Sequence, residues 1–85
     1  MKLSLYHYQG CSFCHLGRRT IDRLDLEVEQ RDILESSERR RELVAATGGQ
    51  TVPCLRIESE DGDVEWKLES RDIIDYLQHL VASSR

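Results

Sequence analysis

The sequence lacks the features that would place this chain across a membrane or on nucleic acid. No apolar run approaches the roughly 18 residues of a membrane-spanning helix. The opening residues, MKLSLYHYQG, lack the apolar stretch and cleavage site of a signal peptide. Lys and Arg number 12 against 16 Asp and Glu, so no basic excess is available to neutralise phosphates. We therefore expect no membrane or nucleic-acid partner, and a cytoplasmic location.

Cysteine and proline are scarce as well. The chain has three cysteines, and an odd number argues against a purely structural disulfide framework. The only proline, Pro53, opens a predicted strand, where its missing N–H does little harm. With 85 residues, of which 39% are hydrophobic, the chain has room for one modest core. We expect a single domain over residues 1–85, and a monomer.

Charged residues are abundant but form no binding surface that the sequence can identify. They make up 33% of the chain, and the net charge is −4. The one basic cluster, Arg39-Arg40-Arg41, lies among glutamates. We interpret it as a solvated helix face and not as a phosphate site.

Hydrophobic periodicity predicts four strands and three helices. Alternating or continuous apolar runs indicate strands at residues 2–8, 26–32, 52–59 and 63–69, with the second at a sheet edge. The last two strands are joined across Asp61-Gly62, which is typical of a hairpin turn. Helical spacing and capping residues predict the three helices. The first runs from Ser12 to about Asp25, and the second begins at a cap, Ser36 or Ser37, and runs to about Ala46. The last is capped by Ser70 and carries an apolar stripe of Ile73, Ile74, Leu77, Leu80 and Val81.

The order β-α-β-α-β-β-α predicts a fold. Its first half is a βαβ unit, which requires parallel strands and a right-handed crossover. Its second half is an antiparallel hairpin followed by a helix. We therefore expect an α/β fold with a four-stranded mixed sheet and helices on both faces.

The motif C-S-F-C-H, residues 11–15, is compatible with three chemistries: a redox dithiol, half of a metal site, or haem attachment. Haem attachment is disfavoured because no signal peptide is present and the only methionine is Met1. A zinc or iron–sulfur site could use Cys11, Cys14, Cys54 and a histidine, but a second Cys-x-x-Cys is missing. We expect no metal site, and interpret Cys54 as a small strand residue.

The position of the motif favours the redox dithiol. Cys11 follows the first strand and begins the first helix, where free backbone N–H groups and the helix dipole stabilise a thiolate. Its pKa should therefore be lowered. Cys14 lies one turn further on, on the same side, and can attack a mixed disulfide formed on Cys11.

Two motifs together resemble a known family. C-S-F-C near the start and T-V-P about forty residues later resemble the glutaredoxin family, within the thioredoxin fold. The closing segment WKLESRDIIDYL resembles the same region in the N-terminal domain of glutathione S-transferases, which shares that fold. The resemblance covers about Lys2 to Val81.

The resemblance implies roles for six residues. Cys11 would be the attacking thiol and Cys14 the resolving thiol. The bond before Pro53 would be cis, and the backbone of Val52 would pair with glutathione. The γ-glutamyl end of glutathione would meet a pair of residues at the last helix, Glu69 and Ser70.

The chain also departs from the family at several positions. Many glutaredoxins have Pro-Tyr between the cysteines, where this chain has Ser12-Phe13, and a lysine where it has Tyr8. The usual Gly-Gly before the last helix is replaced by Lys67-Leu68. The nearest basic candidates beside the cysteine pair are His7, His15, Arg18 and Arg19.

The sequence thus predicts a glutathione-linked thiol–disulfide oxidoreductase acting through a Cys-Ser-Phe-Cys dithiol. Its expected partners are glutathione, as co-substrate, and protein disulfides or glutathionylated proteins, with no other cofactor. The alternative is a non-enzymatic glutathione-binding module, or an iron–sulfur or zinc-binding module, of the same fold.

Overall fold

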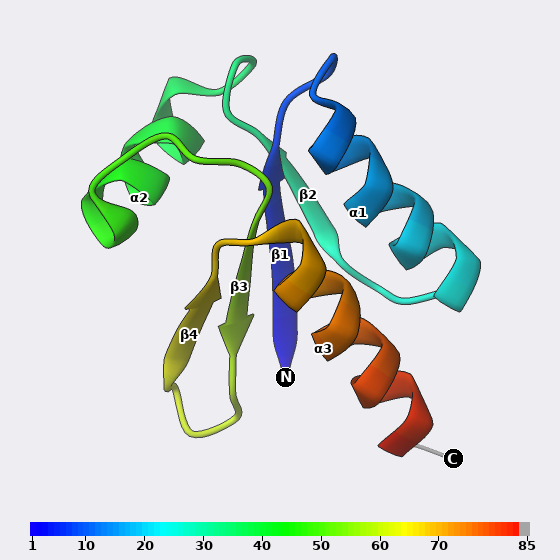
Figure 1. The fold of residues 1–85 in the computed structure, drawn as a ribbon. Helices are drawn as coiled ribbons and strands as arrows, with labels where there is room; N and C mark the ends of the chain where they lie inside the picture. The colour runs from blue at the N-terminus through cyan, green and yellow to red at the C-terminus, as the bar shows by residue number, and fades with distance from the viewer. Residues whose placement is uncertain (84–85) are drawn as a thin grey trace.

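The computed structural model describes residues 1–83, and its element order is β-α-β-α-β-β-α, as predicted (Figure 1). None of the helices in this range is long and apolar enough to cross a bilayer. The elements, in chain order, are β1 (Lys2–His7), α1 (Ser12–Leu24), β2 (Glu29–Asp32), α2 (Ser37–Thr47), β3 (Cys54–Glu58), β4 (Val64–Lys67) and α3 (Ser70–Ser83).

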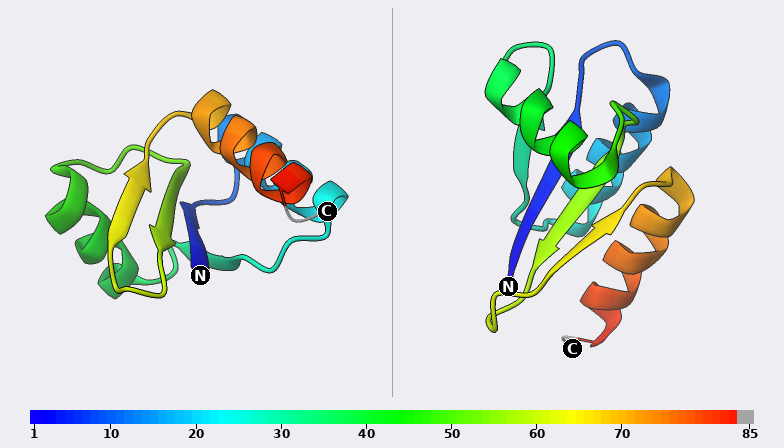
Figure 2. Two further views of the ribbon diagram at one scale, coloured as in Figure 1. Left: turned by 90° about the horizontal axis from the view of Figure 1, so that it is seen from below. Right: turned by 90° about the vertical axis from the view of Figure 1, so that its left-hand side faces the viewer.

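The four strands form one mixed sheet in the order β2-β1-β3-β4. β1 is parallel to β2 and antiparallel to β3, and β3 is antiparallel to β4. β1 is therefore central and β2 lies at an edge, as the sequence predicts. Seen from below, α1 and α3 lie side by side on one face of the sheet and α2 lies on the other (Figure 2).

Alternation along the strands divides the buried side chains into two clusters. Leu3, Leu5 and Leu55 face α1 and α3, where Ile21, Ile73 and Leu77 complete the larger cluster. Tyr6 and Cys54 face α2 and meet Ile33 and Leu43 in the smaller one. Both faces of β1 are covered, which explains its continuous run of buried residues.

The second strand is shorter than predicted, because the end of α1 uses the residues before it. The chain leaves α1 through Asp25, which has a left-handed φ of 53°. The amide of Leu26 then donates to the carbonyl of Ile21 at 3.1 Å. Residues 25–28 therefore form a helix C-cap and a connection, and β2 begins only at Glu29.

The helix caps confirm one prediction and correct another. Ser36 caps α2, and its Oγ accepts the amide of Arg39 at 3.3 Å. The predicted cap of α3 at Ser70 is wrong. The amide of Ile73 donates to the carbonyl of Glu69 at 2.9 Å, so Glu69 is the cap and Ser70 is the first helical residue.

The basic cluster on α2 is only partly a solvated face. Arg40 and Arg41 are exposed, as predicted. Arg39 is half-buried and bridges two carboxylates, Glu42 at 3.0 Å and Glu29 at 3.4 Å. The interpretation of Arg39 as part of a solvated face was wrong, because this side chain ties α2 to the edge strand β2.

Leu43 is the only buried residue of α2, and the packing of this helix on the sheet therefore depends on it. We expect Leu43→Ala to lower the free energy of unfolding by about 2–5 kcal/mol, since it leaves a cavity under α2. The neighbouring exposed residue offers a matched control, Val44→Ala, with a change within about 0.5 kcal/mol. Urea unfolding followed by circular dichroism measures both. Equal changes in the two variants would contradict this packing.

Candidate active site

Cys11 occupies the N-cap of α1. β1 ends at His7, and the chain turns through Gly10, whose φ of 90° favours glycine. Cys11 keeps extended backbone angles, and its carbonyl accepts the amide of His15 at 3.0 Å. The turn therefore places the thiol of Cys11 among the free N–H groups of the first helical turn, as the sequence predicts.

The Cys11 thiol receives hydrogen bonds that favour its ionised form. Its Sγ accepts the amide of Cys14 at 3.4 Å. Partial burial raises the pKa of Cys11, but hydrogen bonds from the Cys14 thiol, from the amides of Cys14 and Phe13 and from the Tyr8 hydroxyl together outweigh it. The net pKa of Cys11 lies below its ordinary value, so this thiol ionises more readily than an ordinary cysteine.

Cys14 has the opposite character. It is fully buried beneath the first turn of α1, and burial, with the contact to Cys11, raises the pKa of its thiol to about 12. At neutral pH it therefore keeps its proton, which it can donate toward the Cys11 thiolate. The two cysteines are free thiols in this structure. One thiol is poised to ionise and the other is not, which is the asymmetry that sequential disulfide exchange requires.

Tyr8 is a site residue to which sequence reasoning gave no role. It lies in the loop between β1 and Cys11, and its hydroxyl lowers the pKa of Cys11 by hydrogen bonding. In return, the negative charge of Cys11 raises the pKa of Tyr8, so the phenol keeps the proton that it donates. Its position three residues before Cys11, where many glutaredoxins have a lysine, was the available signal.

The four basic candidates beside the pair differ in their surroundings. His15 and Arg19 are exposed on α1. His7 is buried, and burial followed by the nearby charge of Arg18 lowers its pKa, so it is neutral. Arg18 donates to Gln9 at 3.2 Å, and its charge slightly counteracts the raised pKa of Cys14. The largest contributions that lower the pKa of Cys11 come instead from Cys14, Phe13 and Tyr8.

The residues expected to meet glutathione lie in two places, the loop before β3 and the start of α3. The Val52-Pro53 bond is cis, as the resemblance implied. Pro53 is buried, whereas Val52 is half-buried and packs, like Tyr8, against the cluster under α2. Glu69 is exposed at the start of α3, and Ser70 is half-buried beside it.

Cys54 lies apart from the other two cysteines. It is fully buried on the α2 face of the sheet, where burial raises its pKa to about 11. Cys14, by contrast, belongs to α1, on the other face. Among residues 1–83 no group of three His, Cys, Asp or Glu side chains is arranged to hold a metal ion. Cys11, Cys14 and Cys54 are thus not brought together as a one-chain metal site.

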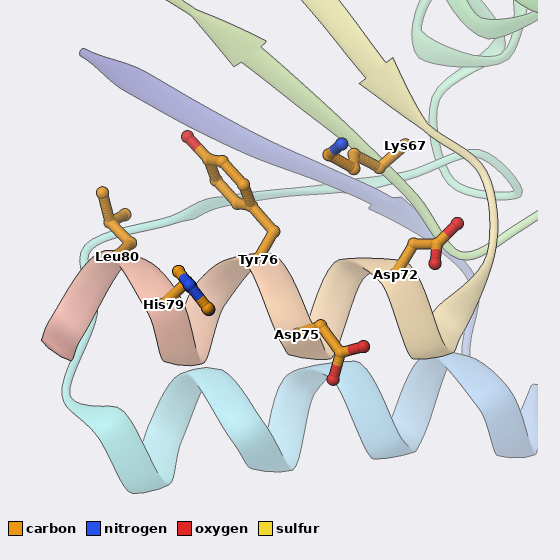
Figure 3. Close-up of a pocket in the computed structure, with 6 residues that line it drawn as sticks. All are labelled: Lys67, Asp72, Asp75, Tyr76, His79 and Leu80. Atoms are coloured by element: carbon orange, nitrogen blue, oxygen red, sulfur yellow. The ribbon is translucent and has the colours of Figure 1, made fainter. Parts of the chain in front are cut away.

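A separate hollow lies between β4 and α3 (Figure 3). Its volume is about 470 Å³. Figure 3 shows Tyr76 rising from α3 and the Lys67 side chain extending toward it, with its Nζ 5.7 Å from the ring centre. The lining contains none of the predicted site residues.

Comparison with known families identifies the family of this chain. The family model of the glutathione S-transferase N-terminal domain matches residues 5–85. The chain belongs to this family. Among curated proteins, none matches the chain.

Solved structures agree with this family in fold. A maleylacetoacetate isomerase from Anaeromyxobacter dehalogenans, with dicarboxyethyl glutathione and citrate bound, is 24% identical with a TM-score of 0.72, over 95% of this chain and 37% of its own. A glutathione transferase homolog from Sulfitobacter with bound glutathione is 18% identical, with a TM-score of 0.72, over 96% and 38%. A glutaredoxin from Brucella melitensis is 20% identical, with a TM-score of 0.68, over 99% and 86%.

These likenesses confirm the thioredoxin-like fold that the sequence resemblance implied. The chain spans little more than a third of the length of the isomerase and of the glutathione transferase homolog, and most of the length of the glutaredoxin. The family is therefore that of a glutathione-related module, and family membership alone does not specify the chemistry of this chain.

The contrast among the three thiols predicts a strict order of alkylation in the native protein. Iodoacetamide should modify Cys11 first, because only its pKa is lowered, while Cys14 and Cys54 stay protonated and buried. The Cys11 rate should rise with pH and reach half its maximum at a lower pH than in the denatured chain. Peptide mass spectrometry at timed intervals measures this, with denatured protein as the control. Modification of Cys54 as fast as Cys11 would contradict the site.

Proposed function

We propose that this chain catalyses thiol–disulfide exchange, with Cys11 as the attacking thiol, Cys14 as the resolving thiol and glutathione as the co-substrate. One observation carries the proposal. The Cys11 thiol caps a helix, accepts the Cys14 amide at 3.4 Å and has a lowered pKa, while the Cys14 thiol one turn away keeps its proton. A structural cysteine pair needs no such difference between its members.

The exchange conserves electrons and protons. The Cys11 thiolate attacks one sulfur of a substrate disulfide, a new S–S bond forms, and the other sulfur leaves as a thiolate that takes up a proton. Cys14 then loses its proton and attacks the Cys11 sulfur, which expels the second substrate thiol and leaves a Cys11–Cys14 disulfide. Two glutathione thiols reduce this disulfide in two further exchanges and become oxidised glutathione.

Family membership supports glutathione as the co-substrate. Two of the structural neighbours hold glutathione or a glutathione derivative. In this chain the residues that would receive it are the backbone of Val52 before Pro53 and the pair Glu69 and Ser70. Ser70 is in the first turn of α3, where free N–H groups favour a carboxylate such as that of the γ-glutamyl end. Protein disulfides or glutathionylated proteins would be the oxidised substrates.

The assigned roles predict that Cys14→Ser traps an intermediate. Incubated with oxidised glutathione, this variant should accumulate one glutathione on Cys11, because no second thiol is placed to displace it. The wild-type chain should convert the same adduct to an internal disulfide. Intact-mass and peptide mass spectrometry distinguish the two products, and Cys54→Ser is the matched control, which should behave as wild type.

The same experiment separates catalysis from binding. If Cys14→Ser and wild type accumulate the same stable adduct, and neither reduces a glutathione mixed disulfide with turnover, the chain is a glutathione-binding module without this activity. If Cys11→Ser still forms the adduct, the attacking thiol is wrongly assigned.

The glutathione assignment predicts a substrate-selective defect in Ser70→Ala. Losing one hydrogen bond to a charged group should weaken the use of a glutathione mixed disulfide about tenfold. Turnover of a small non-peptide disulfide should not change, and stability should change little because Ser70 is not the cap. Ser37→Ala, at the matching first position of α2, should affect neither substrate. A parallel decline with both disulfides would contradict the assignment.

A further inference from the structure

We propose that the α2 face of the sheet carries a second binding site, for a small organic monocarboxylate, separate from the cysteine pair. In Figure 1, α2 lies toward the end of the sheet opposite the N-terminus. Beside it, a hollow of about 470 Å³ is bounded by Ala45 and Ala46 of α2 and by Trp66 of β4. Its lining includes Lys2, Arg31 and Arg56, and none of the residues assigned to the thiol chemistry.

Two buried polar atoms on this face have no partner among the described residues. Arg31 is only 8% exposed, and its Nε–H is unpaired. Its other nitrogens are used: Nη1 donates to the Tyr6 hydroxyl at 2.6 Å and Nη2 to Glu29 at 3.1 Å. Ser4 is fully buried, and its Oγ is likewise unpaired. Buried donors are rarely left without an acceptor, so each of these two calls for one.

The two unpaired donors belong to the same layer of side chains. Ser4 and Tyr6 are two residues apart on β1 and therefore share the α2 face. Tyr6 is paired in register with Arg31, and Ser4 with Arg56 on the other side. Ser4 does not itself line the hollow, but Lys2 and Tyr6, its neighbours on the same face of β1, do. A single acceptor group entering there could take hydrogen bonds from the Arg31 Nε–H and the Ser4 hydroxyl.

Charge decides the kind of acceptor. Three cations line the hollow, Lys2, Arg31 and Arg56, against two carboxylates, Glu42 and Glu58, which leaves one positive charge in excess. At its border Arg39 and Glu29 add one charge of each sign. A monoanion is favoured in this setting, whereas a multiply charged phosphate would be repelled by the two glutamates.

The guanidinium of Arg56 can donate to such a carboxylate. In this structure the Arg56 Nη1 donates to Glu58 at 2.9 Å. The side chains of both residues are partly exposed, so a ligand carboxylate can replace that of Glu58. The guanidinium lies 5.9 Å from the centre of the Trp66 ring, which holds it beside the hollow. The Ala45, Ala46 and Trp66 side chains leave an apolar wall for a short aliphatic body.

Trp66 allows a direct test, because it is the only tryptophan in the chain. Titration with hexanoate should change its fluorescence to saturation. Hexanamide, the neutral analogue, and inorganic phosphate should each bind at least about tenfold more weakly, because hexanamide lacks the charge and phosphate lacks the apolar body. No saturable change with hexanoate, or equal binding of hexanamide, would overturn the proposal. Tighter binding of phosphate would overturn the carboxylate assignment.

Two variants and a control locate the site. Ser4→Ala and Arg56→Gln should each raise the dissociation constant for hexanoate about tenfold. Ser59→Ala removes another buried unpaired hydroxyl, on the hairpin, and should leave it unchanged. Urea unfolding of Ser4→Ala without ligand tests whether this variant is folded. An unaltered rate of Cys11 alkylation in the variants would show that the thiol site is independent of the carboxylate site. Wild-type affinity in both variants would place the ligand elsewhere and refute the proposal.

Discussion

The hydrogen bond from the Cys14 amide to the Cys11 sulfur is the interaction on which the proposed chemistry of this chain depends. It exists because α1 begins at residue 12 and leaves its first amides without helical partners. The turn after β1 brings the sulfur to them, and Tyr8 adds a hydroxyl from the same loop. Hydrogen bonding from Cys14, Phe13 and Tyr8 overcomes the partial burial that would otherwise raise the pKa of Cys11.

The rest of the fold keeps this turn in place. β1 is buried on both faces, so its end point is fixed by two clusters of side chains at once. On the α2 face, the Tyr6 hydroxyl donates to Glu42 at 2.9 Å and accepts from Arg31 at 2.6 Å, which joins β1, β2 and α2. Tyr8 and Val52 both pack against the cluster under α2, so the loop before Cys11 and the loop before Pro53 are held by the same buried side chains.

Much of this arrangement could be predicted from the sequence, because local signals were strong and agreed with one another. The Cys-x-x-Cys spacing at a strand-to-helix junction was sufficient to place Cys11 at the N-cap. Helix ends were harder to predict. A serine before an acidic first turn is a typical cap, yet Glu69 provides the capping carbonyl of α3 and Ser70 follows it. Backbone geometry decides between adjacent candidates, and residue type alone does not.

Long-range contacts were the other part that the sequence could not predict. Nothing local indicates that Arg39 reaches back to Glu29, or that Ser4 and the Nε of Arg31 are left unpaired in one layer. These follow from the strand order β2-β1-β3-β4 and its register. Tyr8 is an intermediate case: its position relative to Cys11 was visible, but its contact with the thiol needed the turn through Gly10.

The pH titration of thiolate absorbance tests the central claim most directly, namely that the fold ionises Cys11 and neither of the other cysteines. The wild-type chain should show one step below the pKa of an ordinary thiol. Cys54→Ser should keep that step, and Tyr8→Phe should move it to higher pH through loss of the hydroxyl donor. Cys11→Ser should abolish it. A low step that survives in Cys11→Ser would contradict the account.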